Sequence, residues 1–428
     1  MTKQQPSETR DAYTGVEYNL GFHVRHYGLD LTYKVRPNRL EGTASLSVIA
    51  EEDLSAMTLD LTGRLSVRRV TAPVRVARFK HSGHKLRVTF ADAVPAGTEF
   101  ILEVRYGGNP GPRRTAWGEI GWEELTDGSL VASQPNGAAT WFPCDDTPSR
   151  KSTYDGHVTA DAPYYVVVNG ELLGRAARGS ATTWHYRSEL PAASYLMTVQ
   201  TGDYRRFELG SRTHAWAPPS VEAEVRQAFA RQEEMLGLFE TTFGDYPYPS
   251  YGVVIAEDEL EIPLEAHGLS TFGINHLDPE WERLLAHEVA HQWFGNSLGL
   301  KRWSDIWLNE GFACYCEWLW AEHAHGLPVV DSVREHYDGL AKKPQDIVIA
   351  DPGPKDMFDD RVYKRGAITL HALRVSLGDE AFFAAVRRYV AAGRHSLVEP
   401  ADLRAELGDV DAVWDAWLNE PALPECPQ

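Results

Sequence analysis

The stretch LLAHEVAHQWFGN, residues 284–296, places two histidines four positions apart and a glutamate directly after the first of them. Its apolar residues recur at helical spacing, and Gly295 stands where a helix would end. Residues four apart on a helix lie on one face with Cβ atoms about 6 Å apart, so His287 and His291 can reach one zinc ion. Glu288 projects to the side of that face, where a carboxylate can serve as general base towards a water molecule.

The competing explanation is a helix that carries two histidines without any metal. An HExxH motif arises by chance in about one such sequence in twenty, so a third ligand has to decide. Glu310 lies 19 positions beyond His291 in WLNEGFACYCEWLW, a segment that predicts the next helix. Requiring a glutamate at that offset lowers the chance to roughly a few in a thousand. Two histidines and one glutamate leave a fourth zinc position open for water, which is typical of a catalytic site.

The composition indicates which classes of partner and which cellular compartment to expect. The chain has 428 residues and a formal net charge of −19 at pH 7. Such an acidic surface repels nucleic-acid phosphates and anionic lipids, so we expect neither partner and slightly favour amine-bearing ligands. No uncharged apolar run reaches the length of about 18 residues that a membrane span needs, and residues 1–15 lack the apolar centre of a secretion signal. We therefore expect a cytoplasmic protein.

The four cysteines are too few and too unevenly spaced for a disulfide framework in a chain of this length. Cys314 and Cys316 resemble a C-x-C ligand pair, but residues two apart on a helix face different directions. The sequence therefore favours ordinary buried thiols at these two positions.

The periodicity divides the chain into two parts. Residues from about 20 to 205 alternate apolar and polar side chains between turn residues, which predicts antiparallel strands. After WAPPS, residues 216–220, the period becomes helical, and Ser220 is a good N-cap. We expect an α+β protein with an all-β domain in residues 1–212 and a mainly helical domain in residues 213–428. Further helical signals occur near residues 280–294, 308–325, 366–377, 379–392 and 410–418.

HEVAHQWFGN followed by WLNEGFA resembles the zinc aminopeptidase family that includes aminopeptidase N and leukotriene hydrolase, within the gluzincins. The resemblance extends from about residue 18 to about residue 420. It implies one zinc ion held by His287, His291 and Glu310, with Glu288 as the general base. It also implies a saddle-like antiparallel β-sheet domain followed by a thermolysin-like catalytic domain.

Other segments extend the resemblance to further site residues. RVYKRGAITLHALR is similar to the segment whose tyrosine donates a hydrogen bond to the oxyanion, which implies this role for Tyr363. SQPNGAATWFPCDDTPSRKSTYD is similar to a segment whose glutamine lines the substrate end of the cleft, here Gln134. Glu317, two turns beyond Glu310, is either an acceptor for the N–H of a ligand histidine or a surface glutamate.

The segment that binds the free N-terminus of a substrate in this family departs from its usual pattern. Here it reads IPLEAHGLSTFG, residues 262–273, and it keeps Glu265 as the carboxylate for the substrate ammonium. Ile262 and Pro263 replace a glycine and an alanine, and Ala266 replaces an asparagine. Proline has no N–H, so we expect a backbone contact to substrate to be lost or redirected.

Three functions fit these observations. The first is a zinc aminopeptidase acting on peptides with a free N-terminus, and the second is an endopeptidase with the same zinc chemistry. The third is a catalytically silent peptide-binding protein of the same fold. The chain has no room for the extra C-terminal domains common in the family, so we expect an open cleft that a homo-oligomer or a partner chain would cover.

Overall fold

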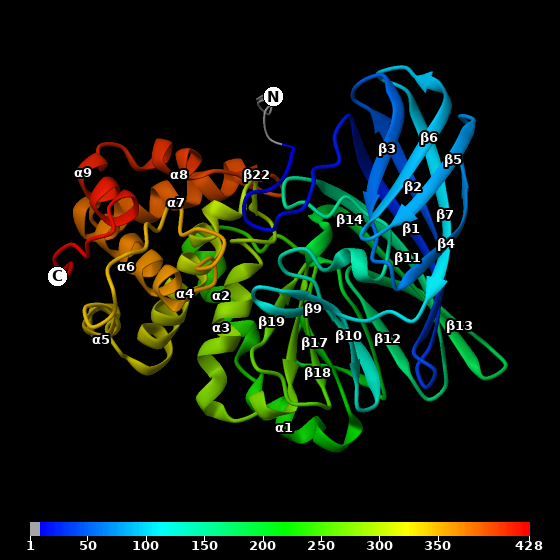
Figure 1. Cartoon of the computed structure of the whole chain (residues 1–428). Coiled ribbons are helices and arrows are strands. Elements are labelled where there is room, and N and C mark those ends of the chain that lie inside the picture. Colours follow the sequence, from blue (N-terminus) through cyan, green and yellow to red (C-terminus); the bar gives the residue numbers. More distant parts are fainter. Residues whose placement is uncertain (1–8) are drawn as a thin grey trace. The chain divides into compact units, whose positions relative to one another are not determined.

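The computed structural model describes residues 9–428, and the chain in it forms two compact units (Figure 1). Residues 1–8, part of the polar stretch interpreted above as lacking a secretion signal, lie outside the described residues. The N-terminal unit runs to Arg205 and adds Trp216–Ser220 and Ala256–Asp258. The C-terminal unit holds Arg206–Ala215, Val221–Ile255 and Glu259–Gln428. Each unit includes short segments from the other unit's part of the sequence, so no single residue divides them. The domain boundary after residue 212 therefore stays a prediction.

A seven-stranded sheet forms the main layer of the N-terminal unit, with the strand order β13-β14-β11-β1-β2-β7-β4. β1 and β11 run parallel, whereas β1 and β2, like β11 and β14, run antiparallel. Buried and exposed residues alternate along β1 because successive side chains of a strand point to opposite faces. The strands are β1 (Phe22–Lys34), β2 (Arg39–Ala50), β4 (Leu65–Thr71), β7 (Glu99–Gly108), β11 (Lys151–Asp161), β13 (Glu171–Arg178) and β14 (Ala181–Ala193).

Two smaller sheets complete this unit. One has the order β3-β6-β5, and the other has the order β12-β15-β10-β9-β8. Apolar side chains from the strands and from the 3-10 turn at residues 138–140 and the residue after it form a continuous core that includes Tyr27, Tyr106, Trp122 and Trp141, each 1% exposed or less. The predicted antiparallel β domain is therefore confirmed, apart from the parallel pair β1 and β11. The strands are β3 (Leu54–Asp60), β5 (Val76–Ser82), β6 (Lys85–Val94), β8 (Arg113–Thr115), β9 (Gly118–Leu125), β10 (Gly128–Ala132), β12 (Tyr165–Val168) and β15 (Val199–Gly202).

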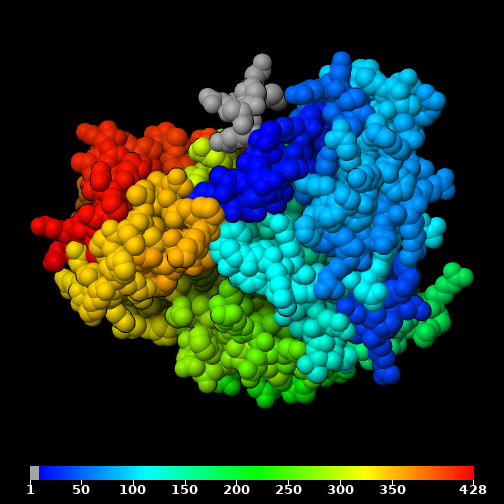
Figure 2. Space-filling model, in the orientation of Figure 1, coloured from blue at the N-terminus to red at the C-terminus, as the bar shows by residue number. Residues whose placement is uncertain are grey.

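Helices dominate the C-terminal unit. They are α1 (Glu222–Ala228), α2 (Gln232–Phe243), α3 (Glu282–His291), α4 (Trp307–His325), α5 (Val329–Leu340), α6 (Asp360–Leu377), α7 (Asp379–Gly393), α8 (Pro400–Leu407) and α9 (Asp411–Trp414). In the space-filling view α5 to α9 lie together as one continuous body, coloured yellow to red (Figure 2). A five-stranded sheet has the order β16-β17-β18-β20-β19, and β21 pairs with β22. These strands are β16 (Arg205–Glu208), β17 (Thr213–Ala217), β18 (Tyr251–Ala256), β19 (Leu264–Ala266), β20 (Leu269–Gly273), β21 (Gly299–Leu300) and β22 (Leu397–Val398).

Some predicted helix limits were wrong. Ser220 caps no helix, since α1 starts at Glu222 after a short 3-10 turn and has no side-chain cap. The helical segment that follows is broken into α1 and α2, and the buried ring of Phe229 in the break packs against Phe272 at 5.0 Å between centroids. α3 ends at His291 rather than at 294, because the N–H groups of Gln292 and Trp293 donate to carbonyls three positions earlier instead of four. Residues 296–298 then donate to carbonyls five positions earlier, which widens the turn that follows. Gly295 in this turn has a φ of 117°.

Two glycines allow α4 and α6 to cross at close range. A Cβ atom added to Gly311 would lie 2.9 Å from the carbonyl carbon of Gly366 and 3.1 Å from its Cα. Both contacts are with backbone, which cannot move aside as a flexible side chain would. The crossing matters for the site because α4 carries Glu310 and α6 carries Tyr363.

We predict that Gly311→Ala destabilises the protein by about 1–3 kcal/mol, since the added methyl group overpacks the crossing of the two helices. Urea unfolding followed by circular dichroism measures the change. Gly237→Ala in α2 is the matched control, because a Cβ atom there meets nothing within 4 Å and alanine is the better helix former. Equal stability of the Gly311→Ala variant and the unaltered protein would show that the crossing tolerates a methyl group.

Candidate metal centre

The predicted ligands meet at the faces of α3 and α4. The imidazole rings of His287 and His291 lie 4.7 Å apart between centroids and are nearly perpendicular, at 77°. Glu310, in the first turn of α4, places Oε2 at 3.5 Å from Nε2 of His287 and at 3.5 Å from Nε2 of His291. All three side chains are buried or nearly so.

These separations fit one zinc ion. The three ligand atoms lie within 4.8 Å of one another. Zinc bonds of about 2.0–2.1 Å in a tetrahedron would put neighbouring ligand atoms about 3.3 Å apart. The observed 3.5 Å between each imidazole nitrogen and the same glutamate oxygen is close to that value. The structure thus brings together the ligand set that the sequence predicted.

The other nitrogen of each histidine has a hydrogen-bond acceptor. Nδ1–H of His287 donates to Oε1 of Glu317 at 2.7 Å, and Nδ1–H of His291 donates to the backbone oxygen of Phe294 at 3.0 Å. Burial alone would raise the pKa of the Glu317 carboxyl, but the hydrogen bond from His287 outweighs burial and holds this pKa at about 2. Oε2 of Glu317 also accepts from Arg283 at 3.1 Å. Of the two alternatives that the sequence left open for Glu317, the structure shows the acceptor for a ligand histidine rather than a surface glutamate. Both imidazoles direct Nε2 towards the centre.

Glu288 lies beside the ligands and is 4% exposed. Its Oε2 atom has no hydrogen-bond partner among the residues that the structure describes. Burial raises the pKa of its carboxyl to about 8, against the opposing effect of His291 and His287. A buried carboxyl oxygen with no protein partner fits a site that receives a cation and a water molecule, and a cation would favour its charged form.

Tyr363 contributes a ring and a hydroxyl from α6. Its ring stacks parallel to that of His287, with 6.3 Å between centroids and 14° between planes. Burial, followed by the charges of Glu310, Glu265 and Glu288, raises its pKa well above the ordinary value. The phenol therefore keeps its proton and is available as a hydrogen-bond donor.

Glu265 is carried by β19, opposite Ser270 of β20 in the register of a short hairpin. Burial raises the pKa of its carboxyl, the charge of His291 opposes this shift and the charge of Glu310 adds to it. The structure therefore brings Glu265 into electrostatic contact with the predicted ligands. Of the three residues that depart from the family pattern, Ile262 is 61% exposed, whereas Pro263 and Ala266 are buried.

Sequence reasoning missed the residues that attach this hairpin to α3. Gln292 accepts from the backbone N–H of Gly268 at 3.0 Å and donates to the carbonyl of Ala266 at 3.3 Å. Asn296 donates to the same carbonyl at 2.8 Å. Both residues follow the second histidine in the segment HQWFGN, which the sequence shows plainly. Their shared partner, the carbonyl of Ala266, lies 26 and 30 positions earlier, and no sequence pattern connects it to them.

Gln134 lies in the N-terminal unit, next to a cis peptide bond with Pro135. That the side chain of Gln134 lines the substrate end of a cleft stays a prediction.

Comparisons with known proteins agree with this geometry. Residues 227–417 match the family model described as the peptidase family M1 domain, and residues 23–196 match the peptidase M1 N-terminal domain. Leucine aminopeptidase 2 of Coccidioides immitis is 25% identical, over 98% of this chain and 74% of its own length. Aminopeptidase B of Mus musculus is 26% identical, over 94% of this chain and 70% of its own length.

A solved structure is similar over almost its full length. It is an M1 zinc metallopeptidase from Deinococcus radiodurans, in a mutant form bound to a Tyr-Ser-Ala substrate. The two chains are 28% identical with a TM-score of 0.89, and the alignment covers 98% of this chain and 99% of the other. With both of its units matched and a zinc ligand set assembled on α3 and α4, the chain belongs to peptidase family M1 and is a zinc metallopeptidase.

Proposed function

We propose that this chain is an aminopeptidase that releases N-terminal residues from peptides. The observation that carries the proposal is the position of Glu265, a carboxylate in electrostatic contact with His291 and Glu310. Relatives named leucine aminopeptidase and aminopeptidase B support the same reading, as does the tripeptide bound to the Deinococcus enzyme.

His287, His291 and Glu310 would hold the zinc ion through two Nε2 atoms and Oε2. Zinc at this position supplies Lewis-acid chemistry, since it makes water more acidic and polarises the carbonyl of the scissile bond. The acceptors Glu317 and the carbonyl of Phe294 fix the tautomers that leave both Nε2 atoms free to bind.

The proton transfers fall to Glu288 and the oxyanion to Tyr363. Glu288 accepts a proton from the water as that water attacks the scissile carbonyl, and then returns it to the nitrogen of the leaving amine. The phenol of Tyr363 donates a hydrogen bond to the oxygen that becomes negative in the tetrahedral state, a contribution typically of a few kcal/mol. The reaction forms no acyl-enzyme.

Glu265 would pair with the α-ammonium of the substrate. A carboxylate at a fixed distance from the zinc ligands makes the enzyme count from the N-terminus, so one residue leaves at a time. The amine-binding role also agrees with the acidic net charge of −19. Gln134 is proposed to line the substrate end of the cleft, as the family resemblance implies.

An endopeptidase with the same zinc chemistry is the second candidate. It is favoured by Pro263, which has no N–H to offer a substrate backbone, and by the exposed side chain of Ile262 beside it. N-terminally blocked peptides separate the two, because an aminopeptidase ignores them.

We propose a cytoplasmic location. Within residues 9–428 no helix is long and apolar enough to cross a membrane. The four cysteines are free thiols, with Cys314 and Cys316 buried in α4 as predicted, which suits a reducing compartment. Peptides with a free N-terminus are the proposed partners. That a homo-oligomer or a partner chain covers the cleft stays a prediction.

We predict that Glu288→Gln lowers kcat on an aminoacyl chromogenic substrate by about 10²–10⁴, because the general base is lost while side-chain size is kept. Bound zinc, measured by atomic absorption, should remain at one ion per chain. A chelator should abolish the activity of the unaltered enzyme, and added zinc should restore it. Full activity in the Glu288→Gln variant would contradict the mechanism.

We predict that Glu317→Gln weakens zinc binding by about 10–100-fold, since a neutral amide raises the basicity of His287 less than a carboxylate does. Competition with a chromogenic chelator measures the affinity. Glu335→Gln on the exposed face of α5 is the control and should leave it unchanged. An unaltered affinity in Glu317→Gln would show that the bond to His287 has only a structural role.

We predict that Glu265→Gln lowers kcat/KM for peptides with a free N-terminus by about ten- to a hundredfold, as expected for a lost charge-assisted hydrogen bond. The unaltered enzyme should not cleave acetylated versions of the same peptides. Equal rates on free and acetylated peptides would instead identify an endopeptidase.

A further inference from the structure

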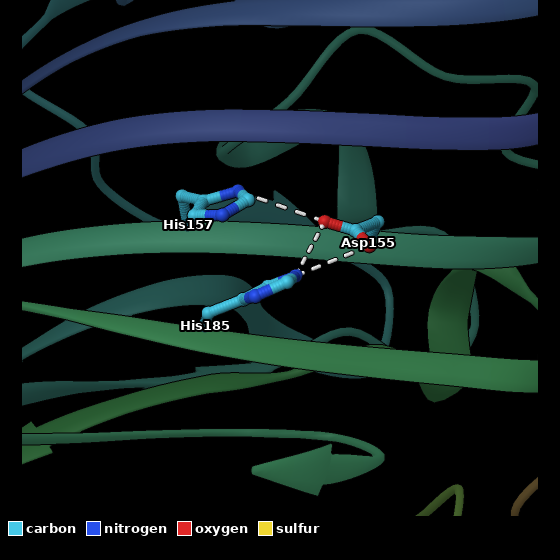
Figure 3. Close-up of side chains that lie close together, drawn as sticks. All are labelled: Asp155, His157 and His185. Carbon is cyan, nitrogen blue, oxygen red and sulfur yellow. Dashed lines mark hydrogen bonds and ion pairs between the residues drawn. The ribbon is translucent and has the colours of Figure 1, made fainter. Parts of the chain in front are cut away.

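Two histidines and an aspartate lie together on the seven-stranded sheet of the N-terminal unit (Figure 3). His157 on β11 is the direct register partner of His185 on the antiparallel strand β14. Asp155 precedes His157 by two positions on β11, so the pleat places it on the same face. The proposed peptidase reaction uses none of these three side chains.

The two histidine side chains approach the same carboxylate oxygen of Asp155. Oδ1 of Asp155 lies 3.0 Å from Nε2 of His185 and 3.6 Å from Nδ1 of His157. The two imidazole rings stack, with 4.0 Å between centroids and 17° between planes. Figure 3 shows both rings with a nitrogen turned towards the aspartate. All three ligand atoms lie within 4.8 Å of one another.

The nitrogen–oxygen distances resemble those of the zinc centre in the other unit, although the ring orientation differs. The rings there are nearly perpendicular at 77°, whereas the stacked rings here lie at 17°, so one imidazole has to rotate to direct its nitrogen at a shared ion. In the zinc centre, two imidazole nitrogens each lie 3.5 Å from one oxygen of Glu310. Here the corresponding distances to Oδ1 of Asp155 are 3.0 and 3.6 Å, which bracket the separation of about 3.3 Å between neighbouring ligands of tetrahedral zinc. Two imidazoles and a carboxylate form a donor set that suits zinc and related first-row ions better than magnesium or calcium.

We propose that Asp155, His157 and His185 form a second metal site, which binds a divalent transition-metal ion such as Zn²⁺. The ion would link β11 to β14 and leave a fourth position open to water.

Arg187 on β14 orients the carboxylate. Its Nε–H donates to Oδ2 of Asp155 at 2.8 Å, while Oδ1 faces both histidines. Although burial opposes it, the hydrogen bonds from Arg187 and His185 lower the pKa of Asp155, so the carboxylate is charged at neutral pH. The guanidinium also repels a bound cation, so this site should bind zinc more weakly than the catalytic centre.

The face around the cluster gives an ion access. The side chains of His157, His185 and Asp155 are 47%, 27% and 17% exposed. On β1 the register partner of Asp155 is Gly28, which has no side chain to cover the carboxylate. The next outward residue of β1 is Asp30, the register partner of His157, which adds negative charge to this face.

Isothermal titration with zinc alone tests the proposal on the full chain, first loaded with one zinc ion per chain and dialysed. Excess magnesium occupies sites made only of oxygen ligands. We expect a second equivalent of zinc to bind, and we expect His157→Gln or His185→Gln to weaken this second event by at least about tenfold. His84→Gln, which alters an exposed histidine elsewhere in the same unit, is the matched control and should leave it unchanged.

Anomalous diffraction from zinc-soaked crystals of the unaltered protein gives a readout that needs no variant. A peak within about 2 Å of Oδ1 of Asp155 and of both ring nitrogens would support the site. Absence of a second equivalent, or its full retention in both histidine variants, would overturn the proposal. An anomalous peak confined to His287, His291 and Glu310 would overturn it as well, and none of these outcomes depends on peptidase activity.

Discussion

The C-terminal unit depends on the position of one atom, Oε2 of Glu310, at 3.5 Å from the Nε2 atoms of both His287 and His291. The carboxyls of Glu310, Glu288 and Glu265 gather around these two histidines, largely shielded from water. Several carboxylates in a low-dielectric interior repel one another unless a cation lies among them. A zinc ion among the three ligands would relieve this repulsion in addition to supplying its chemistry.

The surrounding structure holds that atom in place from several sides. α4 supplies both the ligand Glu310 and, two turns later, the acceptor Glu317, so one rigid helix fixes a ligand and the tautomer of another ligand. The crossing at Gly311 and Gly366 keeps α6 close to α4 and brings the ring of Tyr363 over His287. Each of these contacts restricts the conformations of the proposed catalytic groups. The groups are therefore preorganised for the reaction.

Glu265, the proposed substrate-binding carboxylate, is attached to the helix of the predicted metal ligands through the turn that follows α3. Gln292 and Asn296 hydrogen-bond the backbone of the hairpin that carries Glu265. Residues 284–296 therefore hold two of the proposed zinc ligands, the proposed general base and the attachment of the proposed amine-binding strand. A fixed distance between the amine site and the zinc site follows from this attachment, and such a distance is what a peptidase needs to remove residues singly.

The sequence by itself determined the features that depend on local periodicity and spacing. Strand alternation predicted the β domain, the four-residue spacing of the histidines predicted a shared helix face, and the offset of Glu310 predicted the third ligand. α8 was missed because short helices gain most of their stability from tertiary packing, although Pro400 at its start was a usable signal. α5 was also missed, although its buried residues Val329, Val333 and Leu340 recur at helical spacing. The partners of Gln292 and the pairing of His157 with His185, 28 positions apart, were decided only by the tertiary structure. Hairpin attachment and strand register bring together residues that are distant in the chain, and no local pattern encodes which of them will meet.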